Sequence, residues 1–241
     1  ERALRVYSFR EDIGHAFGGF AFWAPECVGI NDISAKEFYT DPQKMYYSQL
    51  YALNQWRHDL PAVFPDMYNV DVEACGCRLK YPEGSVPVIA EHVIKEKSDL
   101  AKLKIPDPQR DGRIPYLTEI ANMHREKLGD LFYVCVATQA PFSGVVGLRG
   151  FQNLVRDMRR DPDFVHSMLE YMLEVQIVFN KAVVDAGGMP PVPCDAWAAM
   201  PNISEDQTME FVVPYTARLL EAIHEYAGYK AGWFLGWGYS H

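Results

Sequence analysis

The sequence predicts an α/β fold with a parallel sheet, because strand-like segments alternate with capped helices along the chain. The segments that predict strands are 60–68, 131–138, 191–197 and 231–237. Strands that alternate with helices in this way are typical of parallel sheets. A doubly wound sheet and a (β/α)8 barrel both fit this order, and eight complete barrel units would need about 100 further residues or more.

In the first half of the chain, local signals predict two helices and a hairpin. Asp41 and Pro42 open a helix that reaches Arg57, because Asp is a good N-cap and Pro suits the first helical position. Residues 75–95 predict a β-hairpin with its turn at 82–84. A helix is expected from Arg113 to Leu128, followed by the nearly continuous apolar strand 131–138.

In the second half, the helix signals are capping residues. Asp161 and Pro162 open a long helix that reaches Ala186, where its apolar positions keep helical spacing. Ser204 and Gln207 form a capping box at the start of a helix that runs to Ala227. Pro214 is expected to kink this last helix.

Composition and charge exclude several classes of protein. The chain has 241 residues, of which 49% are hydrophobic, and carries a net charge of −9. Lysine and arginine occur in runs of at most two, so binding to nucleic acid or to an anionic membrane is not expected. A fully apolar run long enough for a transmembrane span is absent. The five cysteines include no CxxC pair, which favours a reduced, cytoplasmic protein.

The order of several short motifs resembles the uroporphyrinogen decarboxylase superfamily over residues 25–241. This superfamily includes the heme-pathway decarboxylase and methyltransferases that act on corrinoid proteins or coenzyme M. The motifs are Phe64-Pro65-Asp66, Glu73-Ala74-Cys75-Gly76, Ala140-Pro141-Phe142, which resembles a turn of the family, and then Asp195-Ala196, Ile203-Ser204, Phe211 and Pro214-Tyr215. The chain resembles the corrinoid and coenzyme M methyltransferase branch more than the heme-pathway decarboxylase.

The resemblance implies a (β/α)8 barrel with its active site at the C-terminal ends of the strands. It implies a single domain over 1–241, with a helical or extended segment at 1–58 and the first barrel units at 59–241. The barrel is expected to be incomplete at the C-terminus of this chain, because the sequence stops at His241 directly after a strand.

The functional expectation is a methyltransferase that moves a methyl group from a small methylated substrate to a corrinoid protein. The richness in aromatic residues hints at a methoxylated aromatic substrate. An alternative is a decarboxylase of a porphyrinogen or an aromatic acid, with Arg113 and Arg149 as carboxylate clamps. Residues 23–32 lack the Arg-rich segment that anchors propionates in the heme-pathway enzymes, which disfavours this alternative. A second alternative is a non-catalytic subunit that binds a corrinoid or porphyrin.

Three carboxylates are the expected catalytic residues. Asp66 ends a buried strand, where desolvation would raise its pKa and let it donate a proton. Glu73 could share acid and electrostatic roles with it, or form a structural ion pair with Arg78. Asp195 follows the third strand and could bind a metal or a leaving group, or could simply cap the next helix.

Aromatic and amide side chains near strand ends are the expected substrate-binding residues. Gln139 and Phe142 follow the second strand, and Trp197 and Trp237 end the third and fourth. His92, after an apolar run, is a further candidate. By its spacing, His241 matches the histidine of a zinc-binding His-x-Cys pair in the methyltransferase branch, so zinc is a candidate cofactor. The expected partners are a corrinoid protein and a second copy of the chain in a homo-oligomer.

Overall fold

The computed structural model describes residues 32–56, 62–63, 66, 68–128, 135–187, 191–199, 201–228 and 232–233. Its central sheet has the strand order β1-β4-β5, and both neighbouring pairs are parallel. In register, Ala62 of β1 lies opposite Cys135 of β4, and Gln139 of β4 lies opposite Cys194 of β5. The predicted parallel sheet is therefore confirmed.

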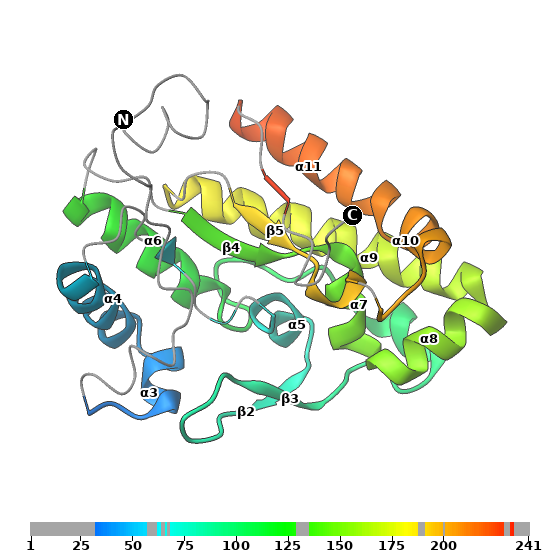
Figure 1. Ribbon diagram of the computed structural model, residues 1–241, viewed down its shortest axis with the longest axis horizontal. Helices are drawn as coiled ribbons and strands as arrows, with labels where there is room; N and C mark the ends of the chain where they lie inside the picture. Colours follow the sequence, from blue (N-terminus) through cyan, green and yellow to red (C-terminus); the bar gives the residue numbers. More distant parts are fainter. Residues whose placement is uncertain are drawn as a thin grey trace.

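Helices surround this sheet, and a separate hairpin lies at one end of it (Figure 1). The strands are β1 (Ala62–Val63), β2 (Arg78–Lys80), β3 (Val88–Glu91), β4 (Cys135–Gln139) and β5 (Val192–Cys194). The helices are α3 (Ala35–Thr40), α4 (Pro42–Trp56), α5 (Val70–Ala74), η1 (Lys97–Lys102), α6 (Ile114–Leu128), α7 (Pro141–Arg149), α8 (Phe151–Arg160), α9 (Pro162–Asp185), η3 (Ala196–Ala198), α10 (Glu205–Phe211) and α11 (Val213–Ala227). In the described ranges, no helix is both long and apolar enough to cross a membrane.

Elements with strong local signals lie where the sequence predicts them. The helix opened by Asp41 and Pro42 is α4, and the antiparallel pair β2–β3 is the expected hairpin. Asp161 caps α9 by accepting a hydrogen bond from the backbone of Phe164 at 3.2 Å. Both halves of the capping box at Ser204 are formed.

Three predicted elements differ from the structure. The helix expected to continue to Ala227 is two helices, α10 and α11, because Pro214 has no N–H to extend the first and suits the first turn of the second. The strand expected over 191–197 ends at Cys194 and is followed by η3. The turn expected at Ala140-Pro141-Phe142 is the start of α7, a helix that the sequence reading missed together with α8.

The core consists of two clusters of buried apolar side chains. One joins α7, α8, α9 and α11, and the other joins α3, α4 and α6 to the sheet. Gly144 allows α7 to lie close to α9, since a Cβ at this position would come within 2.6 Å of the Met172 side chain. This contact fixes α7 at the end of β4, where the candidate site is formed.

Candidate active site

A cavity of about 560 Å³ lies at the C-terminal ends of the three parallel strands. Residues that follow or end each strand line it: Tyr68 and Asn69 after β1, Gln139 at the end of β4, and Ala196 and Trp197 after β5. The remaining walls come from the hairpin, α7 and the start of α8, through Pro87, Val88, Ile89, His92, Ser143, Val146, Gly147 and Phe151. This is the end of a parallel barrel at which active sites form.

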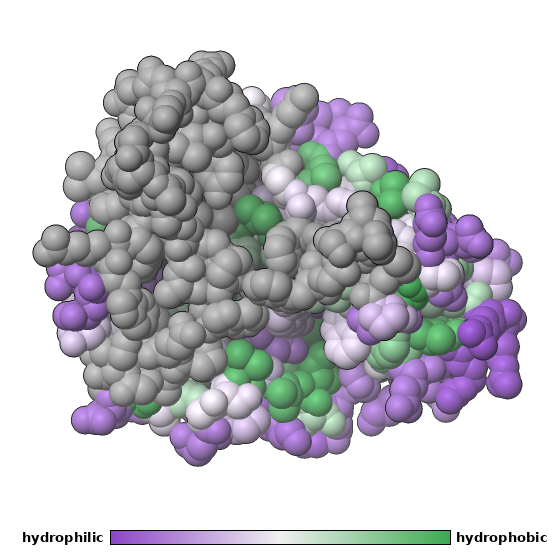
Figure 2. Space-filling view, in the orientation of Figure 1, coloured by the Kyte–Doolittle hydropathy of each residue, from purple (hydrophilic) through white to green (hydrophobic). Residues whose placement is uncertain are grey.

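The described wall of the cavity is apolar, aromatic and uncharged. None of its lining residues is Asp, Glu, Lys or Arg. The rings of Phe151 and Trp197 stack with their centroids 5.1 Å apart, and Trp197 is 40% exposed. Figure 2 shows a group of hydrophobic side chains in the region of the hairpin. The cavity therefore suits a flat, uncharged ligand.

Polar atoms are held at defined places in this apolar wall. Asn69 donates from Nδ2 to Oδ1 of Asp66 at 2.6 Å and to the carbonyl of Pro87 at 2.9 Å. The Nδ1 atom of His92 lies 2.8 Å from the carbonyl oxygen of Gly147. Gln139 is 1% exposed, and its Oε1 has no hydrogen-bond partner in the part of the chain that the structure describes. These side chains can orient a ligand without carrying a charge.

Asp66 lies behind the cavity wall, in a buried ion pair with Arg113. The Nη2 atom of Arg113 lies 2.7 Å from Oδ2 of Asp66, and its Nε lies 2.5 Å from Oε2 of Glu73. Burial raises the pKa of the Asp66 carboxyl, and the guanidinium of Arg113 and the amide of Asn69 oppose this shift. Asp66 therefore acts on the cavity through Asn69, as a positioning residue.

The ion pair considered between Glu73 and Arg78 is not formed. Glu73 lies in α5 and pairs with Arg113, whereas Arg78 lies in β2 and pairs across the hairpin with Glu91. The register of the hairpin places Arg78 opposite Glu91, which explains the different partner. Glu73 does not line the cavity either, so its role is to hold Arg113.

Asp195 is completely buried. It lies directly after β5 and caps α7, the helix that follows the neighbouring strand β4. Its Oδ1 accepts a hydrogen bond from the backbone N–H of Ser143 at 2.9 Å, and its Oδ2 accepts one from Thr216 at 3.3 Å. Burial raises the pKa of this carboxyl to about 6. The cap anchors α7, whose Ser143 lines the cavity, while Asp195 itself does not line it. The helix it caps is α7, before it in the chain, rather than the next helix.

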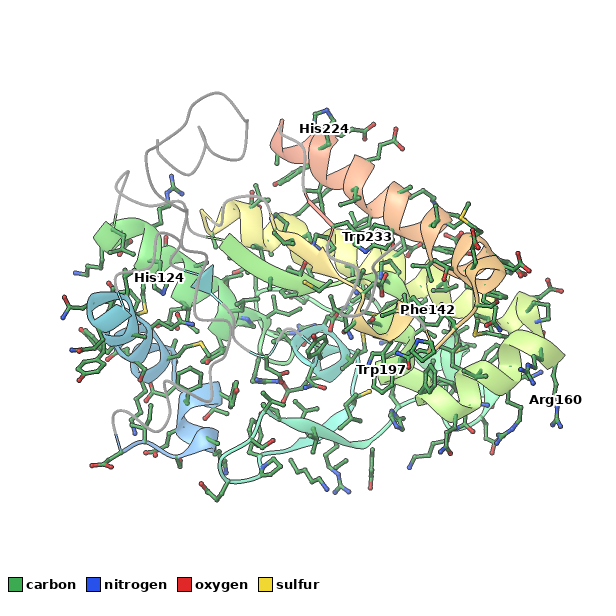
Figure 3. The ribbon with its side chains drawn as sticks, in the orientation of Figure 1. His124, Phe142, Arg160, Trp197, His224 and Trp233 are labelled. Carbon is green, nitrogen blue, oxygen red and sulfur yellow. The ribbon has the colours of Figure 1, made fainter. Side chains whose placement is uncertain are left out.

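The expected substrate-binding residues divide into three groups. Gln139 and Trp197 line the cavity, as expected. Phe142 does not, because α7 begins at Pro141 and turns this ring into the core, where it is fully buried. Both Phe142 and Trp197 are labelled in Figure 3, close to α7. Trp237 and His241 lie outside the described residues.

The described side chains do not form a metal site. Among them there is no group of three or more His, Cys, Asp or Glu that could hold a metal ion. His241, the expected zinc ligand, lies outside that part of the chain.

The sequence reading missed Asn69 and Ser143. Asn69 stands three residues after Asp66 at the same strand end, so the rule that placed Asp66 at the barrel mouth could also have placed Asn69 there. Ser143 could be placed at the cavity only if the start of α7 was predicted, and the sequence analysis does not predict this helix. Its backbone N–H and its place in the wall both depend on that helix.

Comparison with known proteins agrees with this architecture. The model of the family described as "Uroporphyrinogen decarboxylase (URO-D)" matches residues 27–234. Uroporphyrinogen decarboxylase from Geobacter sulfurreducens is 24% identical over 172 residues, 69% of this chain and 48% of its own length. The corresponding protein from Methylibium petroleiphilum is 24% identical over 203 residues, 79% of this chain and 53% of its own length. The chain thus spans about half the length of these curated relatives.

A solved structure with the same fold is a methyltransferase from Methanosarcina mazei. It superposes with a TM-score of 0.78 at 19% sequence identity, covering 91% of this chain and 63% of the other. The expected barrel type is confirmed by this superposition and by the family match. The chain belongs to the uroporphyrinogen decarboxylase (URO-D) family.

Proposed function

We propose that this protein is a methyltransferase that moves a methyl group from a small, uncharged methylated substrate to a corrinoid protein. The observation that carries the proposal is the uncharged, aromatic wall of the cavity at the strand ends. The substrate of the heme-pathway decarboxylase has eight carboxylates, which call for several cations in the site. The described part of the cavity wall offers none of them.

The two arginines that a decarboxylase would need as clamps are both engaged in the protein interior. Arg113 pairs with Asp66 and Glu73. Arg149 lies 2.8 Å from Asp157 and also donates to the carbonyl oxygens of Ile94 and Lys95. Freeing either side chain for a substrate would leave a buried carboxylate without its partner, which is costly.

The relative with this fold that is named a methyltransferase supports the same reaction class. The nucleophile would come from a cob(I)alamin carried by the partner protein, and an ether or amine would leave only if its departing atom were protonated or coordinated. Tyr68 is our candidate for this proton donor, because it lines the cavity and its phenol hydroxyl can donate a hydrogen bond or a proton to the departing atom.

Mixing the full-length protein with cob(I)alamin and one class of methyl donor at a time tests this proposal. The donors are methoxyarenes, methylamines and methylthiols, in a folded and metal-replete sample. Conversion to methylcobalamin, followed in the visible spectrum, is expected with an uncharged donor. A parallel sample receives uroporphyrinogen. Release of CO2 from it, without methylcobalamin from any donor, would instead indicate a decarboxylase. Binding of a corrinoid or porphyrin without either reaction would indicate a non-catalytic subunit.

Trp197→Ala is expected to raise KM for a methoxyarene about tenfold, since an aromatic stacking contact and its buried area are lost. The half-exposed position of Trp197 means that the fold should tolerate the truncation. Tyr226→Ala is the matched control, because Tyr226 is exposed to a similar degree and lies in a different groove, between α6 and α9. Steady-state kinetics of both variants decide the outcome: an equal KM in both would remove the stacking role.

A further inference from the structure

We propose that the cavity selects its ligand through a hydrogen-bond donor, an uncharged hydroxyl or N–H group on a flat apolar molecule. Three residues of the wall, Asn69, His92 and Gln139, present acceptor atoms to that donor. The inference deepens the proposed function by naming the substrate class, and it rests on that function for the reaction itself.

Gln139 provides the first acceptor. Its side chain ends β4 at the cavity wall and is almost completely buried. Among the described residues, its Oε1 nevertheless has no hydrogen-bond partner. A buried oxygen without a partner costs free energy in the empty protein, and a ligand that donates to it recovers that cost on binding.

His92 provides the second acceptor. The carbonyl oxygen of Gly147 can only accept, so Nδ1 of His92 must carry the proton in their contact. In the neutral ring, Nε2 is then the unprotonated nitrogen. Gly150 has φ +83°, and a Cβ there would lie 3.0 Å from this Nε2. A side chain at position 150 would therefore crowd this nitrogen, and the glycine keeps it free of a Cβ contact.

Asn69 provides the third acceptor. Its Nδ2 faces the Asp66 carboxylate and the Pro87 carbonyl, and both of these groups only accept hydrogen bonds. The two contacts therefore fix the amide so that its nitrogen is used by the protein. The oxygen Oδ1 is the end of the amide that remains for a ligand at this wall.

The three acceptors define the chemistry of the ligand. A carboxylate on the ligand can only accept hydrogen bonds. Its oxygens would therefore face the lone pairs of the three acceptors, and the described wall has no Lys or Arg to bind them. An uncharged hydroxyl or N–H makes the missing hydrogen bond, while its ring can pack against Phe151 and Trp197. A site built to bind a donor discriminates strongly against an analogue that lacks it.

Calorimetric binding of two matched ligands to the full-length protein tests the inference. 4-Methoxyphenol carries a hydroxyl donor, and 1,4-dimethoxybenzene has the same ring with the donor methylated. 4-Methoxyphenol is expected to bind about tenfold tighter or more than 1,4-dimethoxybenzene. 4-Methoxybenzoate is expected to bind more weakly than either. Equal affinities of the first two ligands, or tightest binding of the benzoate, would overturn the inference.

Gln139→Met separates recognition from structure. It removes the acceptor with little change in shape, so 4-methoxyphenol is expected to lose about tenfold in affinity and 1,4-dimethoxybenzene almost none. The thermal midpoint should stay unchanged or rise, because an unpaired buried oxygen is lost. His92→Phe is a second variant with the same expected selectivity, and Gln109→Met, in the groove between α6 and α9, is the control without effect.

This inference and the proposed function can be refuted independently of each other. Donor-selective binding that depends on Gln139, without methylcobalamin formation, would sustain this inference and refute the methyltransferase. Methylcobalamin formation with equal use of both ligands, in the parent protein and in Gln139→Met, would sustain the methyltransferase and refute the inference.

Discussion

Replacing Arg113 with methionine is expected to lower the free energy of unfolding by about 3–5 kcal/mol, because it leaves buried carboxylates without their cation. Arg113 is buried and holds Asp66 and Glu73 at the same time. It also donates to the backbone carbonyl of Tyr39 at 3.3 Å, which links α6 to α3. The loss of Asp66 alignment should also disturb Asn69 at the cavity.

Urea denaturation of Arg113→Met and of a neighbouring control measures this effect. Arg110 is exposed and pairs with Asp111, so Arg110→Met should cost at most about 1 kcal/mol. Adding Asp66→Asn to Arg113→Met should restore part of the stability, since it removes the uncompensated charge. A cost for Arg113→Met no larger than that of Arg110→Met would show that the buried ion pair does not stabilise the fold.

Replacing Asp71 with asparagine is expected to raise stability at pH 8 by up to about 4 kcal/mol, because the variant has no buried carboxyl to ionise at that pH. Asp71 is buried in α5 and accepts hydrogen bonds from the Val72 backbone at 2.9 Å and from Gln176 at 3.0 Å. Burial raises the pKa of this carboxyl to about 7 from an ordinary value of 3.8. The Oε1 atom of Gln176 has no hydrogen-bond partner among the described residues, and it could accept from the introduced amide if the Gln176 amide rotates by half a turn.

The pH dependence has a definite sign. Below pH 4, Asp71 is protonated in both the folded and the unfolded chain, so the stability that the protonated carboxyl gives to the fold is fully present. Between pH 4 and about 7 the unfolded chain releases this proton first, and stability falls as the pH rises. Asp195, with a pKa raised to about 6, adds to the loss in the same direction.

Stability curves of the parent protein and of Asp71→Asn from pH 4 to pH 8 test this reasoning. The difference between them should vanish near pH 4 and reach its maximum above pH 7. Asp206→Asn, at an exposed position in α10, is the control and should leave the curve of the parent protein almost unchanged. A variant that is less stable than the parent at pH 8 would show that the ionised carboxylate is favoured in the folded protein.

Local sequence signals were sufficient for much of the fold. The caps at Asp41, Asp161 and Ser204 act on backbone groups within a few residues, so their effect can be read from neighbouring positions. The parallel arrangement of the strands follows equally from their alternation with helices. The place of Gln139 and Trp197 at the cavity then follows from the rule that strand ends form the site.

The partners of the buried charges could not be read in the same way. Asp66 and Arg113 are 47 positions apart, and Asp195 caps α7 through Ser143, 52 positions earlier. Such pairs depend on how helices pack onto the sheet, which no local pattern records. The strand-end carboxylates were therefore expected in the cavity, whereas packing places them behind its wall, where they fix Asn69 and Ser143.

The most direct test of the account is a product analysis in which one preparation of the full-length protein receives two substrates separately. One sample contains 4-methoxyphenol with cob(I)alamin, and the other contains uroporphyrinogen. We expect methylcobalamin and hydroquinone in equal amounts from the first, and no CO2 from the second. Release of CO2 from uroporphyrinogen, with no methylcobalamin from the methoxyphenol, would contradict the assignment of the uncharged cavity to methyl transfer.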